Sequence, residues 1–361
     1  MGITDLARPE ILALQPYASA RSSMSAEGIL LNANEAPTML VDDPALQSLA
    51  LNRYPAPQPA ALRERLAELY GVAEDRLLLT RGSDEGIDLL VRVFCRPGQD
   101  AVAECPPCFG MYRIAAAIQG ADVVTVSREP PGLGLDLPGL CNALAGDPRI
   151  RIVFLTSPNN PTGDRVTPAQ LEQVLQAAEG RALVVLDEAY IEFCSEPSAV
   201  SLIDVYPHLV VLRTLSKAWA AAGLRCGCVV ADPAVIGLLR RVMAPYPLTA
   251  PAIHAALQAT GEGARTRQTA MLQAVSAEKN RLLEFLAGRD WIRALWPGEA
   301  NFVLIRVDDA DALQGWCAER GIRIRSFDGQ PMLEGCLRLT IGAPDEMQAL
   351  LAAFEAWETR Q

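Results

Sequence analysis

A lysine stands inside an apolar stretch of this chain, with hydroxyl groups close to it. Lys217 follows Ser216 in Leu-Arg-Thr-Leu-Ser-Lys (212–217), and Arg225 comes eight positions later. Burying an ammonium group is costly, and the usual outcomes are a lowered pKa or a covalent role. One such role is a Schiff base with a phosphorylated aldehyde, whose phosphate the hydroxyls and Arg225 would hold. The alternative for this segment alone is a lysine at the core edge whose amine reaches water.

A carboxylate at the end of an apolar run is the second candidate group. Val-Val-Leu-Asp-Glu-Ala-Tyr (184–190) predicts a buried parallel strand that carries Asp187 at its C-terminal end, where open α/β sheets bind ligands. A carboxylate there could keep the ring nitrogen of pyridoxal phosphate protonated, which this cofactor needs to act as an electron sink. Tyr190 could present its phenol to the 3-hydroxyl group of that ring. Taken alone, Asp187 could equally cap the next helix, and Tyr190 could pack on the apolar face of an amphipathic element.

A turn rich in proline and asparagine supplies an amide. The apolar run 152–155 breaks into Thr-Ser-Pro-Asn-Asn-Pro-Thr-Gly (156–163), a composition typical of turns. Asn160 could donate a hydrogen bond to the same 3-oxygen, and a cis proline in the turn could aim the amide. By itself this segment is also an ordinary loop between a strand and a helix.

A glycine turn further upstream is a candidate phosphate site. The segment 77–87 predicts a strand, a tight turn at Gly82, and a helix that begins with Ser83 and Asp84. The backbone N–H groups of a helix N-terminus point at bound phosphates, although such turns occur in many folds. Phe109 could stack on a flat ring, and an aromatic residue there is also compatible with plain core packing.

Together, the order and spacing of these motifs resemble one enzyme family over nearly the whole chain. They match the fold-type-I pyridoxal-phosphate aminotransferases, most closely the histidinol-phosphate branch. The motifs that carry the resemblance are 52–55 (Asn-Arg-Tyr-Pro), 81–86 (Arg-Gly-Ser-Asp-Glu-Gly), 157–163 (Ser-Pro-Asn-Asn-Pro-Thr-Gly), 187–190 (Asp-Glu-Ala-Tyr), 215–217 (Leu-Ser-Lys) and 335–338 (Gly-Cys-Leu-Arg).

The resemblance implies a role for each residue around the cofactor ring. Lys217 would form the Schiff base with pyridoxal 5′-phosphate and then move the proton between Cα and C4′. Asp187 would pair with the pyridinium nitrogen, while Tyr190 and Asn160 would set the charge on the 3-oxygen. Phe109 matches the family's stacking aromatic, which is often tyrosine, so any role of that phenol is absent here.

The resemblance also implies how the cofactor phosphate is held. The groups that match the family's phosphate cradle are Gly82, Ser83, Asp84, Ser216 and Arg225. One more group would come from a second subunit: Tyr54 matches a tyrosine that reaches the phosphate of the neighbouring active site. A homodimer with a shared active site is therefore expected.

Two arginines near the C-terminus are the candidate substrate-binding groups. Arg338 is the single charge in the apolar run 335–342, and Arg325 ends a short expected strand, 322–325. In the resembling branch both meet the substrate phosphate, and a planar guanidinium also suits the carboxylate of the second substrate. Surface salt bridges are the alternative.

Two N-terminal residues complete the expected substrate site. Tyr17 resembles a tyrosine that crosses between subunits toward the substrate phosphate, although Ser-Ala stands at 19–20 where the family usually has a Pro-Gly pair after the tyrosine. Asn34 is a candidate contact from a lid over the pocket.

Composition excludes several classes of partner. The net charge of −11 argues against nucleic acid or an anionic membrane as partner. No apolar run free of charge is long enough to span a bilayer, and no signal peptide is expected at the N-terminus. Nine cysteines, an odd number, suit a reducing cytoplasm. With only two histidines in the chain, the pair Cys105 and Cys108 is interpreted as free thiols and no metal site is expected.

The pattern of apolar runs predicts the fold class. Seven short runs between residues 77 and 230 alternate with helical segments, which is typical of an α/β fold with a mainly parallel seven-stranded sheet and helices on both faces. We expect residues 51–250 to form this cofactor-binding domain and residues 251–361 to form an interdomain helix and a smaller α+β domain. Residues 1–50 are expected to pack on the small domain.

The resemblance implies transamination between L-histidinol phosphate and 2-oxoglutarate in histidine biosynthesis, by a ping-pong sequence through Lys217. Two alternatives share every cofactor residue and stay open: an aromatic amino-acid aminotransferase, and a decarboxylase or other lyase of an amino-acid phosphate. A third, the aminotransferase-like sensing domain of a transcription regulator, would require a basic helix-turn-helix module, which is not expected in this acidic chain.

Overall fold

The larger of two sheets has seven strands in the order β1-β7-β6-β5-β4-β2-β3. The computed structural model describes residues 2–13, 46, 48–327 and 329–360. All neighbouring strands are parallel except that β7 runs antiparallel to β1 and β6, which confirms the expected fold class. The strands are β1 (Leu77–Thr80), β2 (Ala101–Glu104), β3 (Asp122–Thr125), β4 (Ile150–Thr156), β5 (Leu183–Asp187), β6 (Leu209–Thr214) and β7 (Gly227–Val230).

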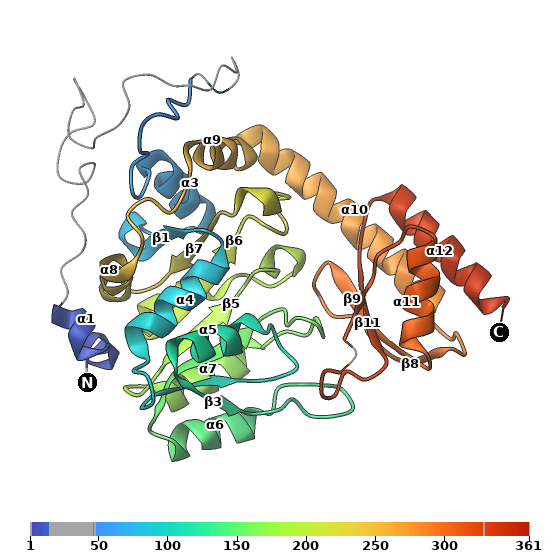
Figure 1. Ribbon diagram of the computed structural model, residues 1–361, viewed down its shortest axis with the longest axis horizontal. Helices are drawn as coiled ribbons and strands as arrows, with labels where there is room; N and C mark the ends of the chain where they lie inside the picture. The colour runs from blue at the N-terminus through green and yellow to red at the C-terminus, as the bar shows by residue number, and fades with distance from the viewer. Residues whose placement is uncertain (1, 14–45, 47, 328, 361) are drawn as a thin grey trace.

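Helices cover both faces of this sheet (Figure 1). Alternate residues of a strand point to opposite faces, so Leu79 packs in one apolar cluster with α3, α6 and α7, and Leu78 packs in another with α4, α5 and α8. We call this assembly the large unit. Its helices are α3 (Ala60–Tyr70), α4 (Ser83–Phe94), α5 (Met111–Gln119), α6 (Leu137–Gly146), α7 (Pro168–Ala178), α8 (Pro233–Val242) and α9 (Ala250–Ala259). Short 3-10 helices lie at Glu74–Arg76, Ile191–Phe193, Ala199–Asp204 and Ala222–Leu224.

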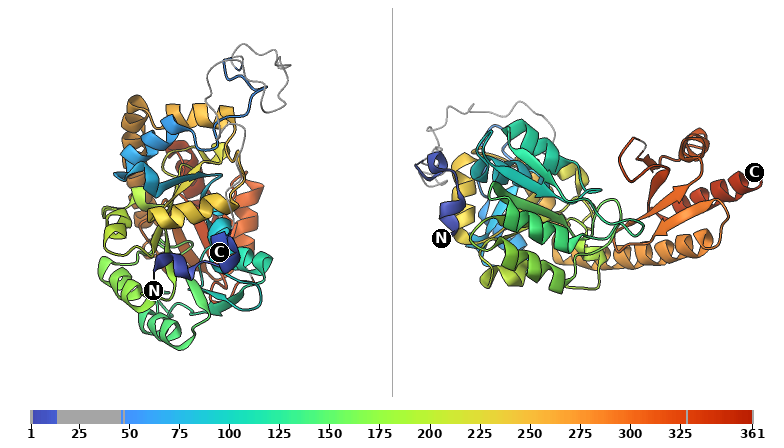
Figure 2. Two further views of the ribbon diagram at one scale, coloured as in Figure 1. Left: turned by 90° about the vertical axis from the view of Figure 1, so that its left-hand side faces the viewer. Right: turned by 90° about the horizontal axis from the view of Figure 1, so that it is seen from below.

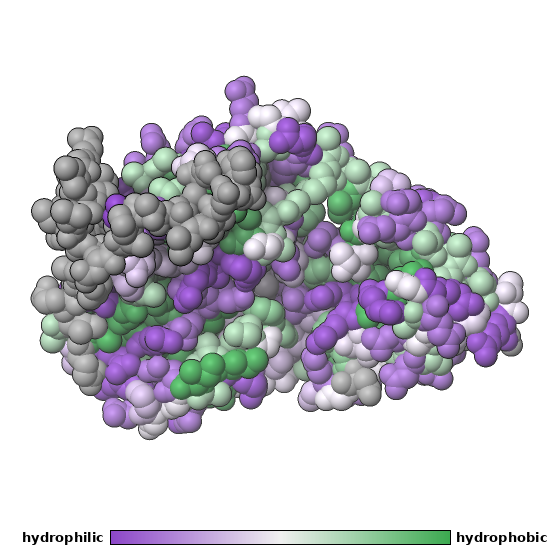
Figure 3. Space-filling view, turned by 45° about the horizontal axis from the view of Figure 1, so that its top comes forward, coloured by the Kyte–Doolittle hydropathy of each residue, from purple (hydrophilic) through white to green (hydrophobic). Residues whose placement is uncertain are grey.

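The smaller sheet is antiparallel, in the order β10-β11-β9-β8. The long helix α10 runs from the large unit to this sheet (Figure 2), and its C-terminal half packs with α11 and α12 in a separate core around Phe354. We call this assembly the small unit. Its elements are α10 (Glu262–Leu286), β8 (Ile292–Trp296), β9 (Phe302–Val307), α11 (Ala310–Glu319), β10 (Arg325–Ser326), β11 (Cys336–Thr340) and α12 (Pro344–Glu358). Hydrophilic residues predominate on the face of this unit seen in Figure 3.

One expected strand of the small unit is placed differently. Residues 322–324 are not in a strand, and Arg325 begins β10 instead of ending a strand. The reason is that this backbone bonds to α11: Ile322 N–H donates to the Cys317 carbonyl (2.9 Å), and Gln314 donates to the Ile324 carbonyl (3.1 Å). Strand β8 was not expected from the sequence.

The first residues of the chain pack on the large unit, contrary to the expectation that they contact the small domain. The segment contains a 3-10 helix (Ile3–Leu6) and α1 (Pro9–Ala13). Leu6 and Ile11 are buried in the cluster under α4 and α8, and Arg241 of α8 donates to the Ile11 carbonyl (3.0 Å). These apolar side chains are buried against α4 and α8, and both helices belong to the large unit.

The two units are joined by polar contacts as well as by α10. Arg165 of the large unit pairs with Glu299 in the β8–β9 turn (2.5 Å), and the Glu299 N–H donates to the Gly163 carbonyl (2.7 Å). Lys279 of α10 donates to the carbonyls of Gly298 and Ala300 (2.9 and 2.7 Å). The bonds of Glu299 tie the turn that follows β4 to the small unit, and those of Lys279 hold the β8–β9 turn on α10. No helix in the described part of the chain is both long and apolar enough to cross a bilayer.

Helix α4 lies very close to the sheet because of Gly86. A Cβ built at this position would meet a methyl group of Val229 at 2.8 Å and one of Leu212 at 3.1 Å. Real Cβ atoms essentially never lie under 3.0 Å from such a neighbour, so a larger residue forces the helix away from β6 and β7. The first turn of α4 is therefore placed by this contact.

We predict that Gly86→Ala lowers the free energy of unfolding by about 1 kcal/mol. Overpacking costs about 1–3 kcal/mol, which outweighs the gain in helix propensity of up to about 1 kcal/mol. Urea unfolding followed by circular dichroism measures the change. Gly237→Ala is the matched control, because Gly237 is exposed in α8 with open space around it, so this variant should be at least as stable as the unmodified protein. Equal midpoints for both variants would contradict the close packing.

Candidate active site

The strands of the large sheet deliver polar side chains to one edge. The parallel strands β4, β5 and β6 end there at Thr156, Asp187 and Thr214. Because β7 runs in the opposite direction, Arg225, two residues before its start at Gly227, reaches the same edge. A cavity of about 630 Å³ lies between this edge and the small unit. It is lined by Ser83, Asp84, Cys108, Phe109, Gly110, Met111, Ile114, Thr156, Asn160, Asp187, Ala189, Tyr190, Thr214, Ser216, Lys217, Arg225, Arg325, Phe327, Gln330 and Arg338.

One end of the cavity is built around the N-terminus of α4. Gly82 caps the helix with φ 79°, and a Cβ there would meet the Arg225 guanidinium at 2.8 Å. Arg225 donates to Asp84 (3.1 Å) and to the Ser216 hydroxyl (3.3 Å). First-turn N–H groups, a guanidinium and a hydroxyl therefore converge, which is the donor set of an anion site.

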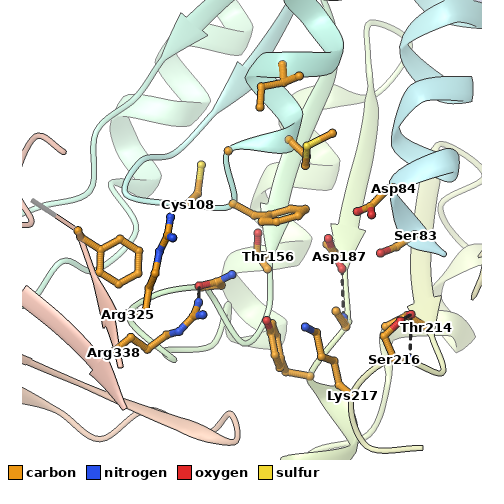
Figure 4. A pocket seen from close by; sticks show the side chains of 18 of the residues that line it. Ser83, Asp84, Cys108, Thr156, Asp187, Thr214, Ser216, Lys217, Arg325 and Arg338 are labelled. Atoms are coloured by element: carbon orange, nitrogen blue, oxygen red, sulfur yellow. Dashed lines mark hydrogen bonds between the residues drawn. The ribbon is translucent and has the colours of Figure 1, made fainter. Parts of the chain in front are cut away.

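Lys217 projects into the middle of the cavity (Figure 4). Burial and the nearby Arg338 lower the pKa of its amine. Its Nζ lies 5.5 Å from the centre of the Tyr190 ring, and none of the described residues accepts a hydrogen bond from it. The chain contains only one other lysine, Lys279, whose amine is held by two backbone carbonyls. Lys217 is thus the amine placed for reaction.

Asp187 is a buried carboxylate beside Lys217. It is 3% exposed, and burial raises its pKa to about 6. Oδ2 accepts from the Tyr112 hydroxyl (2.9 Å) and Oδ1 from the Ala189 N–H (3.1 Å). A cationic ring nitrogen in the cavity would supply the opposite charge that Asp187 otherwise has only in part from Lys217.

Asn160, Tyr190 and Phe109 border the central space from three sides. The Asn160–Pro161 peptide bond is cis, as the sequence suggested, and Asn160 accepts a hydrogen bond from Arg338. Tyr190 packs edge-on against Phe302 (5.3 Å between ring centres), and burial raises its pKa to about 12, so its phenol stays protonated at neutral pH. Phe109 offers an apolar surface that a flat ring can cover.

The other end of the cavity is made by two arginines of the small unit. Arg325 lies directly opposite Arg338 in the pairing of β10 with β11. Each guanidinium is 5.8 Å from the centre of the Phe327 ring. Like charges in opposite positions destabilise a sheet, and the buried Arg338 Nε has no hydrogen-bond partner among the described residues. A bound anion would offset the repulsion between the two guanidinium groups and would accept a hydrogen bond from the Arg338 Nε. In Figure 4 these arginines and the Ser83 end lie on opposite sides of Lys217 and Asp187.

Most of the candidate residues from the sequence meet in this cavity. Eleven line it: Ser83, Asp84, Phe109, Asn160, Asp187, Tyr190, Ser216, Lys217, Arg225, Arg325 and Arg338. Gly82 lies at its rim as the cap of α4. Tyr54 is not part of the lining: it is half-exposed and stacks on Tyr246, with ring centres 4.4 Å apart. Tyr17 and Asn34 lie outside the described residues.

Sequence reasoning missed several residues of the cavity. Thr156 ends β4 as Asp187 ends β5, so its position at a strand end was a usable signal. Phe327 and Gln330, which follow β10, also line the cavity, and nothing in the sequence pattern pointed to them. Tyr112 reads as a core residue of an amphipathic helix, and its contact with Asp187 spans 75 residues of sequence.

Several aminotransferases resemble this chain in sequence or in fold. The family model "Aminotransferase class I and II" matches residues 26–354. Histidinol-phosphate aminotransferases from Cronobacter sakazakii and Xylella fastidiosa are 43% and 44% identical to this chain, over 98% of it and over 97% and 96% of their own lengths. The crystal structure of histidinol-phosphate aminotransferase from Sinorhizobium meliloti in complex with pyridoxal-5′-phosphate is 25% identical, with a TM-score of 0.77 over 86% of this chain and 84% of that one.

The structural similarity and the sequence relatives agree with the geometry of the cavity, where a lysine and a buried carboxylate lie between a helix N-terminus with Arg225 and a pair of arginines. The chain belongs to the class I and II aminotransferase family, among the histidinol-phosphate aminotransferases.

Proposed function

We propose that this chain is a histidinol-phosphate transaminase, which uses pyridoxal 5′-phosphate to exchange an amino group between L-histidinol phosphate and 2-oxoglutarate in histidine biosynthesis. The observation that carries the proposal is the position of Lys217 between two separate anion-binding ends of one cavity. One end suits the phosphate of the cofactor, and the other suits the anionic group of a substrate. The names of the nearly full-length relatives support the choice of substrate.

The residues present fit the cofactor. The α4 N-terminus with Gly82, Ser83 and Asp84, together with Ser216 and Arg225, would hold the phosphate. Asp187 would accept a hydrogen bond from the protonated ring nitrogen, and the Asn160 amide and the Tyr190 phenol would donate to the 3-oxygen. Phe109 would cover one face of the ring. When bound, pyridoxal phosphate supplies an electron sink that stabilises negative charge at the substrate Cα.

Lys217 would carry out the proton transfer. Because burial lowers its pKa, more of the amine is neutral at physiological pH than for an exposed lysine. A neutral amine can take the proton from the substrate Cα and return it at C4′ of the cofactor. Asp187 would assist by keeping the ring nitrogen protonated.

Arg325 and Arg338 would bind the anionic end of each substrate in turn. A planar guanidinium can accept the phosphate of histidinol phosphate in one half-reaction and a carboxylate of 2-oxoglutarate in the other. The unpartnered Arg338 Nε supports this use. We include Tyr17 and Asn34 as further substrate contacts on the basis of the resemblance alone.

We further propose that the enzyme is a cytoplasmic homodimer. Tyr54 lies on the surface of its own chain, stacked on Tyr246, and does not line its own cavity, which supports the expectation that it serves the phosphate site of a partner. We also propose that residues 51–250 form the cofactor-binding domain and residues 251–361 the interdomain helix and small domain, since each range carries one of the two sheets.

Absorbance spectroscopy with single substrates tests the activity. We expect L-histidinol phosphate at low concentration to bleach the visible band of the bound cofactor, and 2-oxoglutarate to restore it, because the amino group moves to the cofactor and back. L-Glutamate should bleach it as the reverse donor. A response to L-phenylalanine without one to histidinol phosphate would instead indicate an aromatic aminotransferase, and release of carbon dioxide would indicate a lyase.

Borohydride reduction followed by peptide mapping tests the reactive amine. With only two lysines in the chain, we predict that the reduced cofactor is attached to Lys217 alone. Lys217→Ala should bind the cofactor without a covalent link and lose at least about 10²–10⁴-fold in kcat, the usual contribution of a positioned acid–base group. The matched control Lys279→Ala should still be labelled at Lys217. Label on Lys279 in the unmodified protein would refute the assignment.

Kinetics of an arginine variant test the substrate end. Arg338→Ala removes charge-assisted hydrogen bonds worth about 1.5–3 kcal/mol, so we expect kcat/KM to fall roughly ten- to hundredfold for both substrates, while the spectrum of the bound cofactor is unchanged. Arg293→Ala is the control, because Arg293 forms an exposed ion pair with Asp308 on the same unit. A loss for only one of the two substrates would show that they do not share Arg338.

A further inference from the structure

A buried tyrosine connects Asp187 to the neighbouring strand. Tyr112 of α5 is fully buried, and its hydroxyl lies 2.9 Å from Asp187 Oδ2 and 2.7 Å from Thr156 Oγ1. The three residues come from α5, β5 and β4, so the contact spans the cavity floor. Neither Tyr112 nor its hydrogen bonds have a role in the function proposed above.

The direction of these hydrogen bonds follows from the number of protons. An ionised carboxylate only accepts, and a phenol has one proton to give. If Tyr112 donates to Asp187, then the Thr156 hydroxyl must donate to the Tyr112 oxygen. Burial and the neighbouring Asp187 raise the pKa of Tyr112 well above its usual range, so the phenol keeps its proton. The result is a chain of donors from Thr156 through Tyr112 to Asp187.

Two aromatic neighbours hold the Tyr112 ring in place. It stacks on Phe154 with ring centres 4.6 Å apart and planes 4° from parallel. Its edge contacts Phe109, at 5.7 Å and 84°. Because Phe109 also lines the cavity, Tyr112 supports both the proposed ring-stacking surface and the carboxylate. A phenol held on two sides is preorganised to aim Asp187.

We propose that Tyr112, backed by Thr156, is a positioning residue that keeps Asp187 ionised and aimed at the ring nitrogen of the cofactor. The inference rests on the function proposed above, in which Asp187 pairs with that nitrogen. With Tyr112 on Oδ2 and the Ala189 N–H on Oδ1, the carboxylate is fixed at both oxygens. The lone pairs that remain are available to the cofactor.

The balance of charges around Asp187 explains why a donor is needed. Burial and Asp84 of α4 raise its pKa, whereas the hydrogen bonds from Tyr112 and the Ala189 N–H and the charge of Lys217 lower it. Tyr190 also lies close enough to interact with it. Without the phenol, the carboxyl group takes up a proton more easily. A protonated carboxyl group is a poorer partner for a cationic ring, so the ring nitrogen would lose its proton more readily.

The test is ¹⁵N NMR of the holoenzyme loaded with cofactor labelled at the ring nitrogen. In the unmodified protein we expect the shift of a protonated pyridinium at neutral pH. In Tyr112→Phe the shift should move toward that of neutral pyridine, and kcat should fall about ten- to hundredfold, the effect of removing one hydrogen bond to a charged group. Thr156→Val should move the shift in the same direction by less, because it weakens the donor chain one step further away.

Tyr70→Phe is the matched control. Tyr70 is buried in α3, and its hydroxyl has no hydrogen-bond partner among the described residues, so the same chemical change should leave the ¹⁵N shift and kcat unaltered. A pyridinium shift in loaded Tyr112→Phe equal to that of the unmodified protein would overturn the inference. If Tyr112→Phe does not fold, the ¹⁵N shift of loaded Thr156→Val is the test, and a shift equal to that of the unmodified protein would overturn the inference.

The outcome separates this inference from the function on which it rests. A neutral ring nitrogen in the unmodified protein itself would show that Asp187 does not act as proposed, and the role of Tyr112 would then fail with it. A protonated nitrogen that is insensitive to both Tyr112→Phe and Thr156→Val would reject the positioning role alone and leave transamination intact.

Discussion

The site depends on ionisable side chains that are buried in the cavity and whose charges are only partly balanced by opposite charges nearby. Burial raises the pKa of Asp187 to about 6 and lowers that of Lys217, because a charge in a poorly solvated cavity is costly unless an opposite charge lies close. Arg338 shows the same effect: burial lowers the pKa of its guanidinium, and its Nε has no partner among the described residues. Such sites are stabilised by ligands of complementary charge, and here the complement is a cationic ring between two anionic groups.

Two other buried arginines among the described residues are paired with carboxylates, unlike Arg338 in the cavity. Arg213 is 6% exposed and pairs with Glu192 at 2.7 Å and Glu188 at 3.7 Å. Arg128 is 2% exposed and pairs with Asp164 at 2.6 Å. A buried pair mainly fixes geometry, since removing one partner leaves an unpaired charge. These pairs hold the strand ends and loops, whereas the unpaired groups face the cavity.

The buried ion pairs are connected to the groups that face the cavity. Glu192, the partner of Arg213, also accepts from the Trp219 indole (3.3 Å), two residues beyond Lys217. Asp164, the partner of Arg128, lies in the turn that carries Asn160. The rigid pairs therefore lie directly behind the reactive groups, and the small unit is fastened to the same turn through Arg165 and Glu299. Ion pairs therefore hold the walls of the cavity.

The sequence by itself determined the sheet and the chemistry of its edge. Short continuous apolar runs favour buried strands of a covered sheet, and a residue that ends a parallel strand lies at the C-terminal edge of that sheet, as Asp187 does. Local pattern carried no information on contacts between distant segments. Tertiary structure alone decided that Tyr112 bonds to Asp187, that Arg325 lies opposite Arg338, and that the first residues pack on α8. Each of these depends on which surfaces meet after folding, and a one-dimensional pattern of apolar and polar residues does not specify that.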